Sequence, residues 1–284
     1  MVEKADLPSR TKGKDIDVRL GSGSWSVCKH MYRPFAIVFV SIAWSLMLGT
    51  LIAGPVDDLI AKGDACALKF EANEALKFYL TAEKLDPANE HLFARISREY
   101  RHEMSDAMQA EQKLNLGSTA VEYAKRAAAL APNDPEAQLA VAISYGKLEL
   151  LQGNREKFEA SRIIKEAADK VIEVDPSSDL AWHVLGRWHM ALADVNAFKR
   201  TLAAMVYGKL PESTYQEAAH CFEKAIALNP NRLMHYIELG CVYAHMGRTD
   251  DARSLIKKGL AMPETEKDDP ETKREGQEVL AKLQ

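Results

Sequence analysis

Two cysteine–histidine pairs are the most chemically suggestive residues in the sequence. His220 directly precedes Cys221, and Cys241 lies four residues before His245. A cysteine within reach of a histidine base is the arrangement of an activated thiol nucleophile. Neighbouring residues on a helix point about 100° apart, so His220 is not placed to serve Cys221. Residues four apart share a helix face, but a cysteine there is more commonly a small packing residue.

Other catalytic and metal-binding patterns are missing from the sequence. His183 and His189 are six residues apart, a spacing that does not put two imidazoles on one helix face. The chain has no Cys-x2-Cys, His-Glu-x2-His, Walker or Gly-x-Ser-x-Gly motif. We therefore predict a protein that is not an enzyme and that uses neither a metal nor another cofactor.

The elements that carry these residues repeat along the chain. Four alanine-rich amphipathic runs close with a proline, at Pro87, Pro132, Pro176 and Pro230. Near the C-terminus the residues fit the tetratricopeptide pattern, in the order Tyr236, Leu239, Gly240, Tyr243, Ala252 and Ile256. No stretch of the body alternates with period two. The sequence predicts an all-α fold, a tetratricopeptide-like solenoid of helical hairpins with insertions.

The proline spacing predicts where the insertions lie. The intervals are 45, 44 and 54 residues, whereas an undecorated array repeats about every 34 residues. The first-half motifs place the extra length at the tip between the two helices of each central hairpin. In the longest insertion we expect a helix from Ala197 to Tyr207. Its apolar residues are Phe198, Leu202, Met205 and Val206, which we expect in the core, with an exposed docking element as the alternative.

The N-terminal segment differs from the repeats. Residues 1–33 mix charged residues, glycine and serine, and we expect them to be disordered. Residues 34–55 carry no charge and are almost continuously apolar from Phe35 to Ala53. That length suits one transmembrane helix of about 20 residues, with a buried core helix or a cleaved signal peptide as alternatives.

The domain prediction follows from these boundaries. We expect a disordered segment at 1–33, a transmembrane anchor at 34–55 and a repeat domain at 56–284. The repeat domain should hold about five hairpins and a C-terminal capping helix from Glu271 to Leu283.

Sequence signals for orientation and organelle conflict. Lys29 and Arg33 precede the apolar segment and Asp57 follows it, so the positive-inside rule alone would separate the repeats from the cytosol. However, residues 18–56 contain no acidic residue but several basic residues and serines, as in mitochondrial targeting segments. No glycosylation sequon or disulfide spacing occurs. We expect the mitochondrial outer membrane, with the repeats facing the cytosol, while orientation and organelle stay open.

Charge is distributed unevenly. Residues 1–33 carry a net charge of +3, which leaves −7 on the remainder, so nucleic-acid binding is not expected. In hairpin arrays the first helix of each hairpin lines the concave face. The basic residues placed there are His91, Arg98, Arg101, His102, Lys147, His183, Arg187 and His245. We expect them to bind acidic peptide segments or phosphate headgroups, with Lys199 and Arg200 as a contact on the insertion. The alternative is ordinary solvated side chains.

A family resemblance rests on the longest insertion and its flanks. Leu185-Gly186-Arg187-Trp188, Arg200 and Pro211-Glu212-Ser213-Thr214-Tyr215 together resemble the regulator of microtubule dynamics family. The runs 122–127 and 163–166 are also similar to that family. The long insertion before Pro-x-Ser-Thr-Tyr is typical of this family and not of ordinary tetratricopeptide repeats.

The resemblance implies a tetratricopeptide-like scaffold associated with microtubules and spindle poles. Some members are anchored at mitochondria by an N-terminal hydrophobic helix, and one acts at contacts with the endoplasmic reticulum, with repeats similar to a lipid-binding module. We expect a membrane-anchored scaffold that binds microtubules, tubulin or another protein and influences microtubule dynamics. The alternatives are a phospholipid-binding or tethering module at a mitochondrial contact site, and a location in the cytoplasm, spindle and spindle pole.

Overall fold

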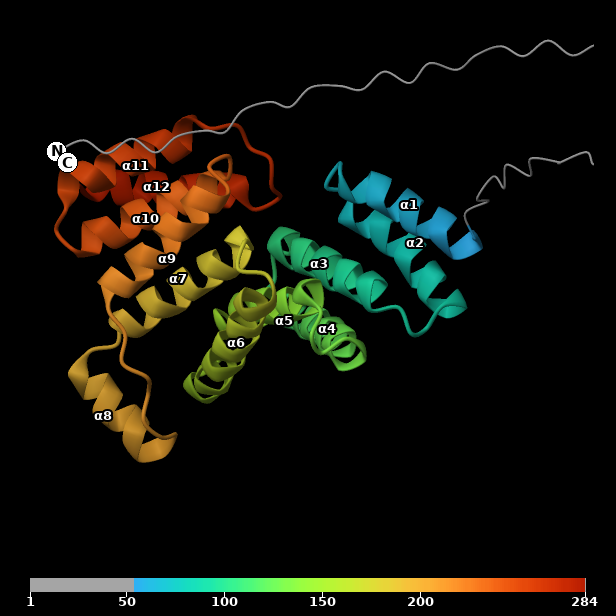
Figure 1. Ribbon diagram of the computed structural model, residues 1–284, viewed down its shortest axis with the longest axis horizontal. Helices are drawn as coiled ribbons and strands as arrows, with labels where there is room; N and C mark the ends of the chain where they lie inside the picture. Colours follow the sequence, from blue (N-terminus) through green and yellow to red (C-terminus); the bar gives the residue numbers. More distant parts are fainter. Residues whose placement is uncertain (1–53, 284) are drawn as a thin grey trace, which may run out of the picture. The chain divides into compact units, whose positions relative to one another are not determined.

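Antiparallel helix pairs follow one another in the computed structural model, which describes residues 54–283 (Figure 1). The first helices of the five pairs are α1 (Pro55–Ala67), α3 (Glu90–Asp106), α5 (Pro135–Glu149), α7 (Asp179–Ala193) and α10 (Leu233–His245). The second helices are α2 (Ala72–Leu85), α4 (Ala110–Leu130), α6 (Asn154–Val174), α9 (Tyr215–Leu228) and α11 (Thr249–Ala261). Each second helix packs on the first helix of the next pair, and α3 also packs on α5. The predicted all-α hairpin array is confirmed.

Two further helices decorate the array. Helix α8 (Ala197–Val206) lies between α7 and α9, and α12 (Asp269–Lys282) follows the fifth hairpin and packs on α10 and α11. Both were expected from the sequence at nearly these bounds. The predicted disordered segment 1–33 and the predicted anchor 34–55 lie outside the described residues, apart from Gly54 and Pro55. Within residues 54–283 no helix is long and apolar enough to span a bilayer.

The repeated prolines mark the joints between hairpins. Each of the four lies two residues after the end of a second helix, where it cannot continue the helix. A cap for the next helix follows two residues later in three of the four joints. Asn89, Asp134 and Ser178 each accept a hydrogen bond from a backbone N–H of the first turn. The joints are therefore defined by local chemistry.

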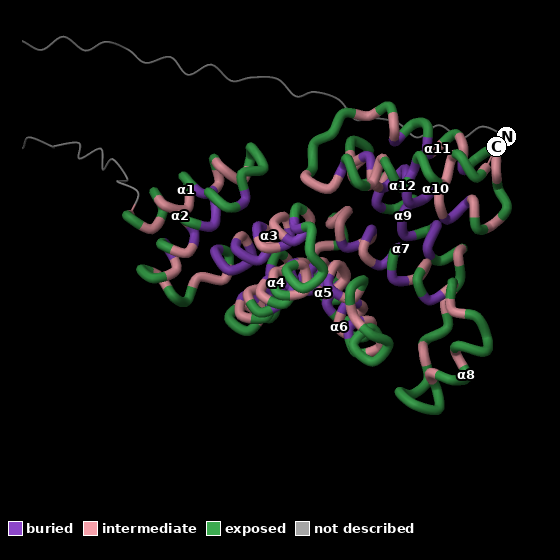
Figure 2. The backbone as a smooth tube through the Cα atoms, turned by 180° about the vertical axis from the view of Figure 1, so that it is seen from behind, coloured by how far each residue is buried: buried purple, intermediate pink, exposed green. Residues whose placement is uncertain are grey.

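Small residues let the two helices of a hairpin approach closely. A Cβ atom at Gly63 would lie 2.3 Å from the Tyr79 ring, and one at Gly240 would lie 2.5 Å from the Ile256 side chain. Tyr79 and Ile256 have no exposed surface. Figure 2 shows buried residues along the facing sides of the helices. Large side chains of the second helix thus fill space left by glycine on the first.

The extra length of the second and third hairpins lies at the tips, as expected, and it is helical. Residues 107–109 form only a short connection, whereas α4 and α6 each have 21 residues against 13 in α11. The inserted residues therefore extend the second helices at the hairpin tips. The added residues of α6 include Arg155, Glu156 and Lys157, which favour helix and tolerate exposure.

The apolar face of α8 corrects the expectation that it lies in the core. Phe198 is 77% exposed and Met205 is 80% exposed, so the prediction that this face joins the core is wrong. Helix α8 makes no extensive packing contact with another described helix. Arg200 holds α8 in position. The Arg200 guanidinium donates to backbone carbonyls of Leu192, Val195 and Pro211, which lie at both ends of the insertion.

The close helix crossing of the fifth hairpin gives a matched pair of stability predictions. Gly240→Ala should lower the free energy of unfolding by about 1–3 kcal/mol, because its methyl group meets Ile256 and the Ala252 carbonyl. Gly146→Ala in α5 is the control, since a Cβ atom there meets nothing within 4 Å. Gly146→Ala should raise the free energy of unfolding by about 0.5–1 kcal/mol, because alanine favours helix more than glycine does. Urea unfolding measures both, and equal stabilisation by the two variants would contradict the crossing geometry.

Candidate functional site

The predicted binding residues separate into two polar clusters and several isolated side chains. The α3–α5 cluster consists of Arg98, Glu99, Arg101, His102, Ser105 and Lys147. The α7–α10 cluster consists of Asp179, His183, Arg187, His235 and Glu238. His91, His245, Lys199 and Arg200 belong to neither.

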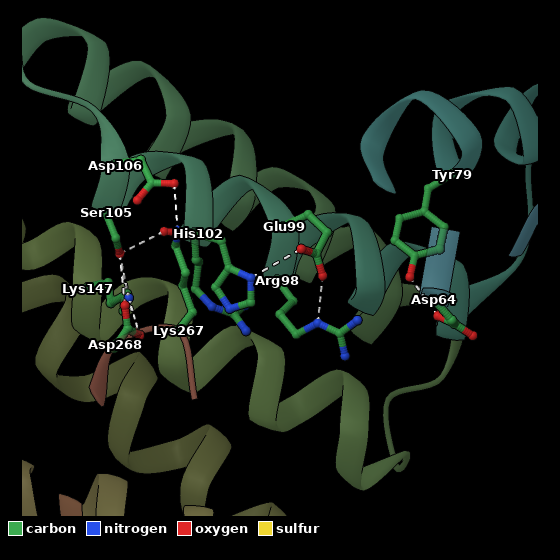
Figure 3. A network of polar contacts seen from close by, with 11 residues as sticks. Asp64, Tyr79, Arg98, Glu99, His102, Ser105, Asp106, Lys147, Lys267 and Asp268 are labelled. Carbon is green, nitrogen blue, oxygen red and sulfur yellow. Dashed lines mark hydrogen bonds and ion pairs between the residues drawn. The ribbon is translucent and has the colours of Figure 1, made fainter. Parts of the chain in front are cut away.

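Helical spacing assembles the α3 part of the first cluster. Arg98, Arg101, His102 and Ser105 recur at intervals of three and four residues, so they share one face of α3. Figure 3 shows Ser105 beside Lys147 of α5, with Arg98 next to Glu99 farther along α3. Arg98 is 40% exposed and Lys147 is 25% exposed at the side chain. The cluster therefore presents accessible cations.

Glu99 organises the centre of the α3–α5 cluster. Its side chain is fully buried and accepts hydrogen bonds from Arg98 Nε at 2.8 Å and His102 Nδ1 at 3.1 Å. Burial alone would raise the pKa of Glu99, but the bonds from His102 and Arg98 outweigh it and lower the pKa below the usual value. Glu99 therefore stays ionised and holds Arg98 and His102 in place. The sequence offered no signal for this role.

Arg101 has a different environment. It is only 8% exposed, and its Nη1 donates to Ser97 Oγ at 3.1 Å and Ser144 Oγ at 2.9 Å. No carboxylate of the described residues forms an ion pair with it. Burial, with repulsion from Arg98, lowers the pKa of Arg101 to about 10, so it remains a cation at neutral pH. A buried cation held only by hydroxyls is electrostatically undercompensated.

The C-terminal segment contributes acidic and basic groups that sequence reasoning missed. Asp268 lies 2.6 Å from Lys147 Nζ and accepts a hydrogen bond from Ser105 Oγ at 3.0 Å. Lys267 lies 2.8 Å from Asp106 at the end of α3. The available signal was the run of acidic residues before and within α12, opposite in charge to the predicted face. Its position could not be inferred because these partners are up to 163 residues apart.

The α7–α10 cluster is mostly buried, which corrects the placement of His183. His183 is 6% exposed, and its Nδ1 lies 3.0 Å from Nδ1 of the fully buried His235. His235 Nε2 lies 2.9 Å from Asp179. His235 Nε2 donates to the Asp179 carboxylate, and the two Nδ1 atoms share a second hydrogen bond. His183 is therefore part of the core and not of an open binding face.

Arg187 remains accessible at the edge of this cluster. Its Nη1 lies 2.6 Å from Glu238 Oε1, and its side chain is 47% exposed while Glu238 is 8% exposed. The attraction of Glu238 outweighs burial and raises the pKa of Arg187 further. The buried Glu238 thus holds the guanidinium of Arg187 at the surface.

The remaining predicted residues make separate contacts. His91 Nδ1 lies 2.9 Å from Glu136, and His245 stacks on Tyr215 with ring centroids 5.0 Å apart. Arg200 is partly exposed and donates to backbone carbonyls within the insertion, and its predicted role as a contact stays a prediction. Lys199 is exposed.

Groups with potential metal or thiol chemistry have structural surroundings. Ligand atoms of His91, Asp134 and Glu136 lie within 4.8 Å of one another, but Asp134 caps α5 and Glu136 pairs with His91. Burial raises the pKa of Cys221 to about 11 and that of Cys241 to about 12. Both side chains are therefore thiols and not thiolates at neutral pH.

The buried histidine pair generates a pH prediction. Burial lowers the pKa of His183 well below 6.5, so only the unfolded chain binds a proton there as the pH falls below 6.5. Wild type should therefore lose about 1.4 kcal/mol relative to His183→Gln between pH 7.5 and 5.5. Burial raises the pKa of Glu149 to about 7, which acts in the opposite direction, so the difference between the two proteins is the relevant quantity. An equal change in the free energy of unfolding between the two pH values for wild type and His183→Gln, measured in urea, would contradict a buried, neutral His183.

Comparisons with known proteins agree with the hairpin fold. A thermophilic tetratricopeptide-repeat protein of Thermus thermophilus superposes with a TM-score of 0.57 at 18% identity, covering 80% of this chain and 99% of that chain. That likeness supports the tetratricopeptide-like solenoid.

Sequence relatives identify the family. Regulator of microtubule dynamics protein 1 of Mus musculus is 26% identical over 232 residues, which cover 80% of this chain and 75% of the mouse protein. Regulator of microtubule dynamics protein 2 of Macaca fascicularis is 27% identical over 196 residues, which cover 67% of this chain but only 46% of the macaque protein. Residues 59–284 match the family model described as regulator of microtubule dynamics protein 1-3. The chain therefore belongs to the regulator of microtubule dynamics family.

Proposed function

We propose that this protein is a non-enzymatic repeat scaffold that associates with microtubules or spindle components by binding acidic peptide segments. The observation that carries the proposal is the α3–α5 cluster, where the partly exposed cations Arg98 and Lys147 lie near the buried cation Arg101 on a domain that is acidic overall. The names of the relatives support microtubules as the cytoskeletal partner.

The charge distribution determines the expected mode of contact. The chain outside residues 1–33 carries a net charge of −7 and would be repelled as a whole by an acidic surface. Attraction must therefore act locally, over distances of about 10 Å or less in 0.1 M salt. Arg98 and Arg187 suit carboxylates because a guanidinium donates to both oxygens, and buried Glu99 and Glu238 hold them in place.

Location is part of the same proposal. The apolar segment 34–55 would anchor the scaffold in a membrane, and the targeting bias of residues 18–56 favours the mitochondrial outer membrane. With the repeats in the cytosol, the α3–α5 cluster would have access to microtubules. The alternative location remains the cytoplasm, spindle and spindle pole.

Microtubule co-sedimentation tests the first function. The full chain in mild detergent should pellet with microtubules at low salt and less at about 0.3 M salt, where charges are screened more strongly. Arg98→Gln should weaken binding by about 1 kcal/mol, roughly fivefold in Kd, because one charge-assisted contact is lost. Arg155→Gln removes the same charge from an exposed residue of α6 and should bind as wild type. Absence of pelleting even at low salt would contradict the proposal.

A second candidate function, contact with phospholipid surfaces, is favoured by α8. Residues 195–211 contain Lys199, Arg200 and Lys209 but no acidic residue. The apolar side chains of α8 are exposed beside these cations. A basic amphipathic helix with this pattern is typical of segments that bind anionic membrane surfaces. Such contact would suit a tethering module at a membrane contact site.

Tryptic protection tests this candidate without interference from the N-terminal segment. The full chain is reconstituted in vesicles of two compositions. Cleavage by trypsin after Lys199 and Lys209 should be slower in vesicles that contain phosphatidylserine than in vesicles of phosphatidylcholine alone. Phe198→Ser should abolish the difference because it removes a large apolar side chain that is 77% exposed. Ala204→Ser, about 120° round the helix from Phe198, should retain it. Equal cleavage of wild type in both vesicles would exclude the lipid contact.

A further inference from the structure

The segment between α11 and α12 reaches the second and third hairpins through a small set of polar contacts. Asp268 contacts Lys147 and Ser105, and Lys267 contacts Asp106 (Figure 3). We call these five residues the C-terminal clasp. The contacts join the last part of the chain to the cluster of cations described above.

The clasp consists of side-chain contacts rather than packed helices. Helix α12 packs on α10 and α11, but it makes no extensive contact with α3 or α5. A Cβ atom at Gly276 would lie 3.0 Å from Ile237, so the body of α12 is seated in the fifth hairpin. The clasp can therefore open while α12 stays in place.

The side chains beside the clasp have capacity for another carboxylate. Asp268 is the acidic group that Lys147 and Ser105 share, and its side chain is 36% exposed. Arg101, on the same face of α3, is held only by the hydroxyl groups of Ser97 and Ser144. Lys147, Ser105 and Arg101 thus combine two cations and a hydroxyl donor with one internal carboxylate. Charge-assisted hydrogen bonds of this kind select carboxylates.

We propose that Lys147 and Ser105, with the positive charge of the buried Arg101 close by, form a binding site for a carboxylate of an acidic peptide, and that Asp268 occupies this site from within the chain. The inference rests on the proposed function only for the class of ligand. An incoming acidic segment replaces Asp268 at Lys147 and Ser105, where the charge of Arg101 adds to the attraction.

Competition by Asp268 has a measurable consequence. A ligand that binds only the open form has an apparent affinity reduced by the fraction of molecules that are open. A partly exposed ion pair such as Lys147–Asp268 shifts that fraction by roughly fivefold. Removing the internal carboxylate should therefore strengthen peptide binding, whereas removing its cationic partner should weaken it.

Fluorescence anisotropy of a labelled twelve-residue peptide of repeating Glu-Glu-Gly tests the inference on the full chain in mild detergent. Asp268→Asn should lower Kd about fivefold, and Lys147→Gln should raise it at least about fivefold. Glu264→Gln changes the net charge as Asp268→Asn does, but Glu264 pairs with Lys273 of its own segment. It should bind as wild type, and a Gln-Gln-Gly peptide should not bind.

The outcomes separate this inference from the proposed function. Equal affinities for Asp268→Asn, Glu264→Gln and wild type would overturn the role of Asp268, and unchanged binding by Lys147→Gln would overturn the site. Thermal melting of each variant identifies a loss that results from unfolding, and the gain expected for Asp268→Asn is not open to that explanation. Microtubule pelleting together with peptide binding that the Asp268 and Lys147 variants leave unchanged would overturn this inference and leave the proposed function standing.

Discussion

Apolar packing between the two helices of a hairpin is the constraint on which the rest of the structure depends, and in the first, fourth and fifth hairpins it is a close crossing at a glycine. Glycine at positions 63, 186 and 240 leaves room for Tyr79, Phe222 and Ile256 of the opposing helix, all fully buried. These contacts fix which face of each first helix turns inward to its partner and which turns away. On α3, which has no glycine, burial of Leu92, Phe93 and Ile96 orients the polar face in the same manner. The polar clusters thus inherit their geometry from apolar packing.

Local signals in the sequence were sufficient for the elements but not for their long-range partners. The hairpins, α8 and α12 could be predicted because prolines, caps and apolar periodicity act within a few residues. The contact between Ser105 and Asp268 spans 163 residues and leaves no local pattern. The burial of His183 depends on His235 in the next hairpin. The exposure of α8 likewise depends on the absence of a neighbouring helix in the described array, which its own amphipathic pattern does not reveal.

The two polar clusters illustrate different uses of a cation on a first helix. Arg98 and Arg187 are each held by a buried glutamate and extend to the surface. Arg101 is buried without an ion pair to any described residue, and Lys147 is paired with an acidic residue from the C-terminal segment. Arg98 and Arg187 are exposed as they stand, whereas Lys147 would become available only when Asp268 releases it. Family membership and fold are compatible with a scaffold whose affinity for acidic partners is moderated by its own C-terminal region.

Mapping the attachment site of a photoreactive acidic peptide by mass spectrometry tests the central claim most directly. On the full chain, the peptide should attach to α3 around residues 98–106 and to α5 around residues 144–148. Attachment there should fall when a peptide without the photoreactive group competes. Attachment confined to the second helices, or to α8, would contradict the assignment of acidic-peptide recognition to the α3–α5 cluster.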